Sequence, residues 1–209
     1  RLAVCGTVND LLMSGSEPKY ITAGYILEEG LDTDDLETVV KSMAETAKEA
    51  GVKIVTGDTK VIEGKGGLII NTAGVGFVND GVRIGPSDLE DGDMLILSGT
   101  LGEHHAAILA SRMGIENDIK SDAAPLNEMV GKLMKTDLAV HAMRDVTRGG
   151  LGTVLNEFAV SSGVNIIIEE KEIPVTPKVR DFCGILGLDP LYMGNEGKMV
   201  LSVKAADAE

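Results

Sequence analysis

Residues 54–60 read Ile-Val-Thr-Gly-Asp-Thr-Lys, a run that predicts a short buried strand ending in a tight turn. The strand is expected because Ile54 and Val55 are β-branched and apolar, and the turn because Gly57 gives the backbone extra freedom. Asp58 and Lys60 are two residues apart, so on an extended segment their side chains project to the same side. A carboxylate and an ammonium group held together suit a magnesium-bound nucleotide. A strand end with a surface ion pair is the simpler alternative.

The segments around this run favour an α+β module, in which helices cover one sheet. The clearest helix has apolar residues at helical spacing behind the acidic pair Asp34 and Glu37, and Gly51 ends it. The expected elements are, in order, an apolar segment at 2–13, a strand at 20–27, this helix, a strand at 52–55, a glycine-rich hairpin at 64–67 and a strand at 68–78.

Asn9 and Asp10 interrupt the first apolar segment. A polar pair in an otherwise buried helix costs stability unless it has partners, because an unpaired buried charge is expensive. Such a pair usually serves a ligand or a helix cap. A helix end at which both side chains are simply solvated is the alternative.

The second half begins after an acidic, glycine-containing stretch at 79–93, where we place a domain boundary. The predicted domains are residues 1–80 and 93–209. His104 and His105 are adjacent, and on a helix they diverge by about 100°, so we interpret them as polar residues at a helix start. The expected elements are a strand at 94–97, helices at 103–112, 126–134, 151–162 and 179–186, a strand at 164–168 and a strand after Glu196.

A glycine-rich turn is predicted between a strand and the helix at 151–162, in the run from Asp145 to Gly150. Glycines at a helix N-terminus leave N–H groups and a positive dipole end, which favour phosphate oxygens. The run contains neither a GxxxxGK[ST] nor a GxGxxG pattern, so both standard nucleotide fingerprints are excluded. Glu196 presents a further carboxylate, just before an apolar strand.

The composition is that of a soluble globular protein, with 33 acidic and 19 basic residues and a formal charge of −14. This charge and the lack of a Lys/Arg cluster disfavour a nucleic-acid partner. Cys5 and Cys183 form no metal-binding spacing, which disfavours zinc and fits a reducing cytoplasm. No apolar run reaches the roughly 20 residues of a membrane helix. Arg1 lies directly inside an apolar run, so we expect a fragment that is truncated at both ends.

Four runs, in this order, resemble the HypE family of hydrogenase maturation factors. They are Ala3-Val-Cys-Gly-Thr-Val-Asn-Asp10, Ile54-Val-Thr-Gly-Asp-Thr-Lys60, Met143-Arg-Asp-Val-Thr-Arg-Gly-Gly-Leu151 and Met193-Gly-Asn-Glu-Gly-Lys198. The resemblance covers essentially the whole chain. The wider superfamily includes aminoimidazole ribonucleotide synthetase, thiamine-monophosphate kinase and selenophosphate synthetase, and it shares the first two motifs. The last two are more specific.

The resemblance implies two α+β domains, each with a mixed sheet, and ATP-dependent dehydration of a carbamoylated C-terminal cysteine to a thiocyanate. That cyanide group is destined for the iron of [NiFe]-hydrogenase. Asp10 and Asp58 would hold Mg²⁺, and Lys60 and Glu196 would act on the thiocarbamate as catalytic residues. The implied partners are a carbamoyltransferase, an iron-binding maturation chaperone complex and a second copy of the chain. The implied nucleotide-binding residues are Asn9, Asp10, Asp58, Thr59, Asp145, Arg148, Gly149 and Gly150.

The chain also departs from the family pattern. Nothing in it matches the C-terminal cysteine segment, because Cys183 lies within a predicted helix. Two alternatives therefore remain open at this point. The chain could act on a different amide or phosphate acceptor, as other superfamily enzymes do, or it could be a noncatalytic scaffold that docks maturation partners.

Overall fold

The computed structural model describes residues 1–208, which fall into two compact units. Unit 1 comprises Arg1–Gly81 and Ala124–Met134, and unit 2 comprises Val82–Ala123 and Lys135–Glu209. The expected division into residues 1–80 and 93–209 therefore differs from the units in one segment, Ala124–Met134, which belongs to unit 1. That segment contains helix α4 (Asn127–Leu133), which packs on helix α1 (Leu2–Leu12) of unit 1. A helix that is far away in sequence thus completes the first unit.

The sheet of unit 1 has the strand order β2-β1-β3, formed by β1 (Glu17–Glu28), β2 (Lys53–Ile62) and β3 (Leu68–Phe77). Strand β1 runs parallel to β2 and antiparallel to β3. Because β1 lies between the other two, the hairpin predicted around residues 64–67 is wrong. Those glycines instead connect two strands that each pair with β1.

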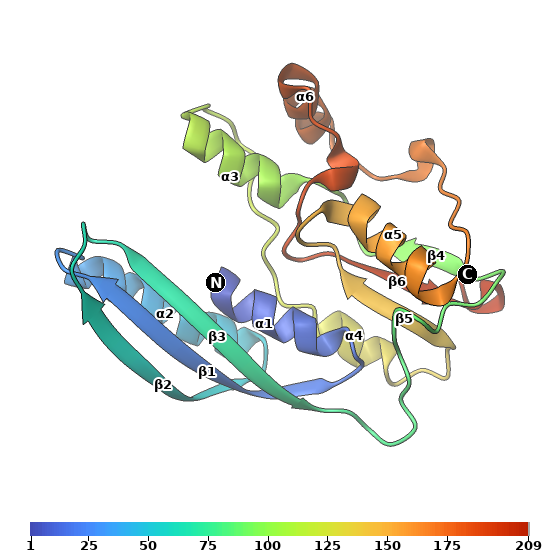
Figure 1. Ribbon diagram of the computed structural model, residues 1–209, viewed down its shortest axis with the longest axis horizontal. Coiled ribbons are helices and arrows are strands. Elements are labelled where there is room, and N and C mark those ends of the chain that lie inside the picture. The colour runs from blue at the N-terminus through green and yellow to red at the C-terminus, as the bar shows by residue number, and fades with distance from the viewer. Residues whose placement is uncertain (209) are drawn as a thin grey trace. The chain divides into compact units, whose positions relative to one another are not determined.

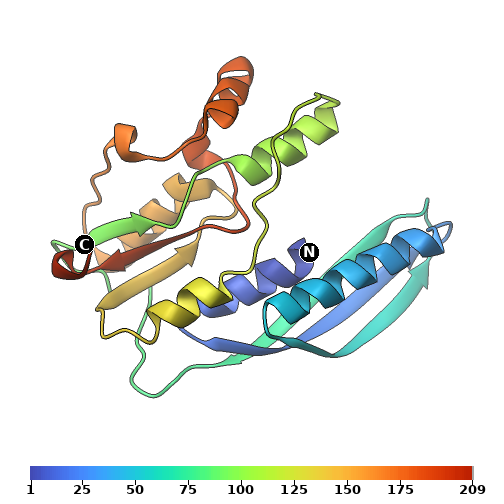
Figure 2. The same cartoon turned by 180° about the vertical axis from the view of Figure 1, so that it is seen from behind.

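Helices α1 and α2 (Thr33–Glu49) cover one face of this sheet. Figure 1 shows the strands in front of both helices, and Figure 2 shows the helices in front of the strands. Val4, Val8 and Met43 are buried in this layer. The carboxylate of Asp32 accepts a hydrogen bond from the Asp34 backbone N–H at 2.8 Å, so Asp32 is the helix cap in place of the predicted pair Asp34 and Glu37.

The predicted buried strand and turn at 54–60 are wrong, because this run is part of one continuous strand whose residues are all exposed. Strand β2 continues through Gly57, which lies opposite Ala23 in the register with β1. A Cβ atom at Gly57 would lie 2.1 Å from the Ala23 carbonyl oxygen. The glycine is therefore required by the close approach of two backbones, not by a turn.

The sheet of unit 2 is antiparallel, with the order β4-β6-β5. It is formed by β4 (Met94–Leu97), β5 (Val140–Asp145) and the fully buried central strand β6 (Met199–Val203). Helix α5 (Gly150–Ser162) packs on this sheet through a core that includes Leu151, Val154 and Phe158. Together with unit 1, this arrangement confirms the predicted α+β fold class.

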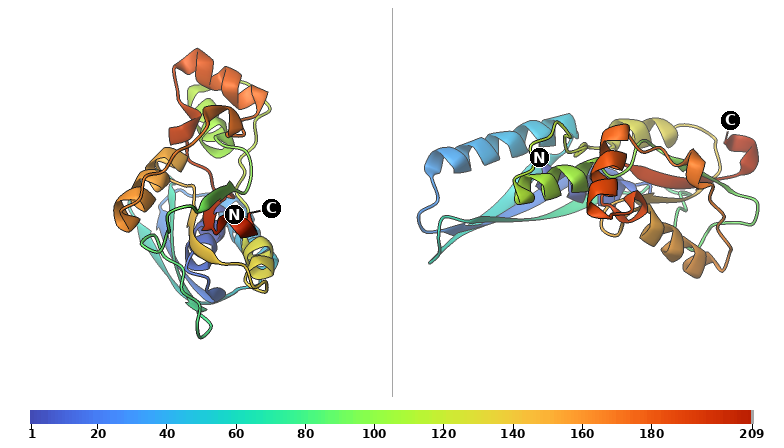
Figure 3. Two further views of the ribbon diagram at one scale, coloured as in Figure 1. Left: turned by 90° about the vertical axis from the view of Figure 1, so that its right-hand side faces the viewer. Right: turned by 90° about the horizontal axis from the view of Figure 1, so that it is seen from above.

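A second apolar cluster joins helices α3 (Glu103–Met113) and α6 (Pro177–Leu186), which lie side by side in Figures 1 and 3. The strand predicted at 164–168 is wrong, because no described strand pairs with this segment and Ile167 is 89% exposed. The remaining elements are the short 3-10 helices η1 (Glu170–Glu172), η2 (Pro190–Tyr192) and η3 (Ala205–Asp207). No helix in residues 1–208 has the length and apolar character needed to cross a membrane.

Candidate functional site

Asp58 and Lys60 form an ion pair on strand β2, with the carboxylate oxygen 2.7 Å from Nζ. Both side chains are about two-thirds exposed, at 69% and 68%. They lie together because alternate residues of a strand project to the same face. A groove of about 560 Å³ runs along this strand, lined by Ala23, Tyr25 and residues 54–59. Asp58 is the lining residue whose carboxylate could ligate a cation.

The Asp58 carboxylate is stabilised in its charged form. Lys60 holds the pKa of this carboxyl below its usual range, and the backbone N–H of Thr59, which donates to Oδ1 at 2.9 Å, acts in the same direction. The carboxylate therefore stays negative well below neutral pH, and a negative carboxylate is the form that a hard cation such as Mg²⁺ requires.

Asn9 and Asp10, near the end of α1, face opposite environments. Asn9 is 2% exposed; its Nδ2 donates to the Ala124 carbonyl at 3.0 Å and its Oδ1 accepts from the Leu126 N–H at 2.9 Å. Asp10 is exposed. The amide thus anchors the chain before helix α4, and only the carboxylate projects outward as a possible ligand.

The glycine-rich turn of unit 2 begins helix α5 after Asp145, whose side chain is buried at the end of β5. Gly149 and Gly150 have positive φ angles of 83° and 63°. A Cβ atom at Gly150 would lie 2.4 Å from the Leu191 carbonyl oxygen, so this glycine is required by packing against η2. Arg148 is exposed beside them. The start of α5 has no side-chain cap, which leaves a helix N-terminus suited to anions.

Asn195 fixes the loop that carries Glu196. It is fully buried, and its Nδ2 donates to the carbonyls of Val146 and Met193, both at 3.0 Å. Its Oδ1 accepts from the Gly102 N–H at 2.7 Å. The loop before β6 is therefore tied to the end of β5 and to the start of α3.

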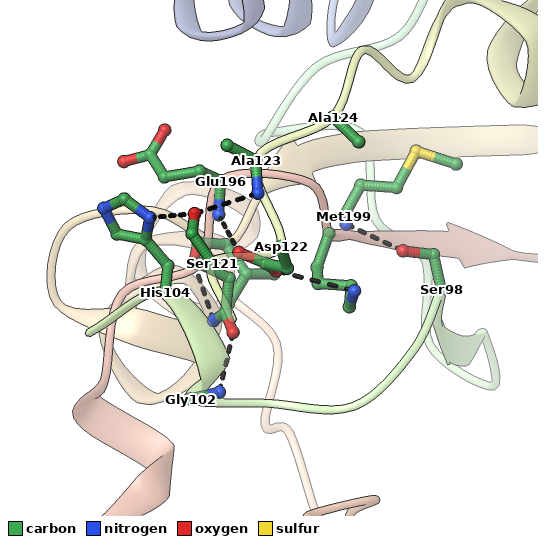
Figure 4. Close-up of polar contacts among 12 residues, drawn as sticks. Ser98, Gly102, His104, Ser121, Asp122, Ala123, Ala124, Glu196 and Met199 are labelled. Carbon is green, nitrogen blue, oxygen red and sulfur yellow. Dashed lines mark hydrogen bonds and ion pairs between the residues drawn. The ribbon is translucent and has the colours of Figure 1, made fainter. Parts of the chain in front are cut away.

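Glu196 follows directly, and its backbone N–H donates to Asp122 Oδ1 at 3.0 Å. The second oxygen of Asp122 lies 3.5 Å from Lys198 Nζ. Ser121, one residue earlier, is 2.8 Å from His104 Nδ1, and burial lowers the pKa of His104. Figure 4 shows the contacts of Asp122 with Glu196 and of Ser121 with His104, with the Glu196 carboxylate directed away from Asp122.

The predicted site residues are divided between the two units. Unit 1 holds Asn9, Asp10, Asp58, Thr59 and Lys60, and unit 2 holds Asp145, Arg148, Gly149, Gly150 and Glu196. Within residues 1–208, no group of three or more His, Cys, Asp or Glu side chains could hold a metal ion. Mg²⁺ is commonly held by one or two carboxylates together with substrate phosphates. Asp10 and Asp58 each offer an exposed carboxylate of this donor type.

The sequence interpretation missed Asp122 and the structural function of Asn195. Asp122 lies in an irregular segment without periodicity, and its partner Glu196 is 74 residues away. The only available signal was the position of Asn195 next to Glu196 in the run Met193–Lys198.

Two protein-family models match this chain. Residues 1–78 match the N-terminal domain of AIR synthase related proteins, and residues 90–209 match the C-terminal domain of the same proteins. The gap between the two matched ranges lies near Gly81, where the chain passes from unit 1 to unit 2.

Individual relatives are similar over the whole chain. Carbamoyl dehydratase HypE of Cupriavidus necator is 50% identical over 100% of this chain and 60% of its own length. The crystal structure of a HypE–HypF complex aligns with a TM-score of 0.95 and 47% identity, over 99% of this chain and 69% of that one. HypE in complex with ATP aligns with a TM-score of 0.95 and 46% identity, over 99% and 63%. The chain thus spans about 60% of the length of such curated relatives.

Proposed function

The chain belongs to the family of AIR synthase related proteins, and we propose that it is part of an ATP-dependent carbamoyl dehydratase of hydrogenase maturation. The observation that carries the proposal is 50% identity over the whole chain to a protein named carbamoyl dehydratase HypE. A solved HypE structure with ATP supports the nucleotide requirement.

The proposed nucleotide-binding residues of unit 1 are Asp10, Asp58 and Thr59. Asp10 and Asp58 would hold Mg²⁺, because both carboxylates are exposed and the pKa of Asp58 is lowered. Asn9 supports them indirectly, since its amide fixes the end of α1 from which Asp10 projects. In unit 2, the turn from Asp145 through Arg148 to Gly150 offers a cation and a helix N-terminus to phosphate oxygens.

The proposed catalytic residues are Lys60 and Glu196. Magnesium-ATP, when bound, supplies the phosphoryl group that converts the carbamoyl oxygen into a phosphate leaving group. Loss of this phosphate and of both nitrogen protons leaves a carbon–nitrogen triple bond on sulfur. Glu196 would accept a nitrogen proton, and the Lys60 cation would stabilise the negative charge that develops. Cys5 and Cys183 are buried, so we propose that the acceptor thiol is a C-terminal cysteine of the longer polypeptide.

The proposed partners follow the same relatives. The HypE–HypF complex supports a carbamoyltransferase as the donor of the carbamoyl group, and an iron-binding chaperone complex would receive the cyanide. We also propose a homodimer, because one face of the unit 1 sheet exposes Ile69, Val75 and Phe77. We also propose a reducing cytoplasm as the location, because both cysteines are buried thiols.

The test uses a polypeptide of the relatives' full length that contains this chain. It is incubated with its carbamoyltransferase, carbamoyl phosphate and magnesium-ATP, and the C-terminal cysteine is analysed by mass spectrometry. We expect a thiocyanate that forms only with ATP. Glu196→Gln and Lys60→Ala should each nearly abolish it while leaving ATP binding largely intact, since they act on the acceptor.

Two outcomes would contradict the proposal. ATP turnover that responds to a small-molecule acceptor but never yields thiocyanate would identify a different enzyme of the family. Normal thiocyanate formation by a well-folded Glu196→Gln variant would reduce this residue to a structural role.

A further inference from the structure

Asp122 is a buried carboxylate in a segment that has no need of one for its own structure. Residues 115–126 form neither helix nor strand, yet the Asp122 side chain is only 5% exposed. Burying a charge costs free energy unless partners compensate for it. The nearby Asp118 follows the usual pattern, since it is 72% exposed and pairs with Lys178 on the surface. A charge that only keeps the surface soluble would be exposed, so the burial of Asp122 needs a different explanation.

Both oxygens of Asp122 are directed at the loop that carries Glu196. Oδ1 accepts the Glu196 backbone N–H at 3.0 Å, and Oδ2 lies 3.5 Å from Lys198 Nζ in an ion pair. Oδ2 is fully buried and has no hydrogen bond among the described residues. One carboxylate thus contacts both the Glu196 N–H, as Figure 4 shows, and the Lys198 ammonium group.

The segment before and after Asp122 is held in place independently. Ser121 Oγ is 2.8 Å from His104 Nδ1 on helix α3, and it accepts the Ala123 N–H at 3.2 Å. Asn195 ties the other side of the contact to Val146 and Gly102. Asp122 therefore connects two fixed segments, and any displacement of its carboxylate would be transmitted to the Glu196 backbone.

We propose that Asp122 is a positioning residue for Glu196. The inference rests on the proposed function, in which Glu196 accepts a proton from the thiocarbamate nitrogen. With its N–H held by Asp122, the Glu196 backbone has one orientation, and its carboxylate is directed away from Asp122 (Figure 4). This arrangement keeps two negative groups on opposite sides of the loop. The ion pair with Lys198 holds the following residues in the same conformation.

The test compares Asp122→Ala and Asp122→Asn in the full-length polypeptide. Asp122→Ala removes both contacts, so we expect the single-turnover rate of thiocyanate formation to fall by up to about 100-fold, as a displacement of about 1 Å at a reacting group can cause. Asp122→Asn keeps an acceptor for the Glu196 N–H, so its rate should fall less. The Kd for magnesium-ATP should stay within about twofold of the parent value for both, a margin well below the tenfold effect of 1.4 kcal/mol.

A second readout does not depend on activity. Hydrogen exchange at the Glu196 amide should become faster in Asp122→Ala but much less so in Asp122→Asn, because only the alanine leaves the N–H without its acceptor. The matched control is Asp118→Asn, which removes an exposed charge from the same segment and should change neither the rate nor the exchange.

Four results would overturn the inference. One is a folded Asp122→Ala protein with the parent rate, and another is a Kd for magnesium-ATP that weakens in step with the rate, which indicates general disruption. If faster exchange at Glu196 comes with unchanged dehydration, the contact exists but positions nothing, and the proposed function stands. If the parent polypeptide forms no thiocyanate, the proposed function and this inference fail together.

Discussion

At the scale of single residues, the charge of Asp58 depends on two neighbours in its own strand. Lys60 lies 2.7 Å away and the Thr59 N–H donates to it, and both lower its pKa. Neither contact buries the group, so the carboxylate remains available to a ligand. The strand therefore supplies an accessible oxygen that is charged at neutral pH.

Asp58→Asn should weaken magnesium-ATP binding about tenfold or more, because the variant loses a charged ligand and 1.4 kcal/mol corresponds to a factor of ten. In the parent protein, the contribution of Asp58 to the affinity should be lost as the pH falls through the lowered pKa of Asp58. The difference in affinity between the parent and Asp58→Asn should therefore shrink as the pH falls through that pKa. Calorimetric titrations at several pH values measure both effects.

The control for this experiment is Asp80→Asn, which removes an exposed carboxylate of the same unit outside the strand. It should bind magnesium-ATP like the parent. Equal affinity of Asp58→Asn and the parent at every pH would exclude Asp58 as a ligand. The melting temperature should not change, since the side chain is 69% exposed.

Contacts between residues could be predicted from the sequence only where the two residues are close together in the chain. The Asp58 and Lys60 pair lies within one strand, and the two-residue period predicts it. The sequence marks Asn9 as a polar group that needs partners, but its partners Ala124 and Leu126 are 115 and 117 residues away. The partner of Asp122 is also distant in sequence, because Glu196 is 74 residues away. Long-range contacts of this kind leave no periodic signal in a single sequence.

At the scale of elements, Gly57 of strand β2 is compatible with two structures, a turn and a strand that lies close to its neighbour. A glycine before Asp-Thr-Lys predicts a turn, because glycine tolerates the dihedral angles of turns. In the structure the strand continues to Ile62, and Gly57 is needed because the β1 backbone lies against it. The strand prediction at 164–168 fails for the opposite reason. Its β-branched residues favour a strand, but no described strand pairs with it.

Gly57→Ala tests this account of β2. The new methyl group would lie 2.1 Å from the Ala23 carbonyl oxygen, so strands β1 and β2 must separate. We expect a loss of about 2–3 kcal/mol in unfolding free energy, which is large for one methyl group. Chemical denaturation monitored by circular dichroism measures the loss.

Gly6→Ala is the matched control for that substitution. Gly6 lies within helix α1, and a Cβ atom there would meet nothing within 4 Å. Alanine is favoured over glycine in a helix by about 1 kcal/mol, so this variant should be at least as stable as the parent. If both variants had the same stability, the close approach at Gly57 would carry no cost.

At the scale of the whole molecule, the two units and their α+β class followed from the alternation of strand and helix patterns. The acidic stretch at 79–93 also lies close to the passage between units at Gly81. The membership of helix α4 in unit 1 could not be predicted. Its packing on α1 depends on Asn9 and on a chain that leaves unit 2 at Ala123 and returns at Lys135.

The unit 1 sheet predicts a homodimer. On β3 every second residue is exposed, among them Ile69, Val75 and Phe77, each more than half exposed. Strand β2 pairs with β1 alone among the described strands, and its Val61 is 64% exposed. An apolar face of this kind, next to a strand edge, is rarely left open to water. We expect the chain in solution to have twice its mass of 21.9 kDa.

Ile69→Lys and Val75→Lys place charges on this face and should convert the dimer to a monomer, because a lysine buried in a dimer interface loses its hydration. Both residues are exposed in the single chain, so the folded monomer should tolerate them. Sedimentation velocity over a range of concentrations measures the mass. Val160→Lys, at an isolated apolar residue of α5 that is 83% exposed, is the control and should stay dimeric. A monomeric parent, or Lys variants that dimerise as the parent does, would show that this face pairs with something other than a second copy.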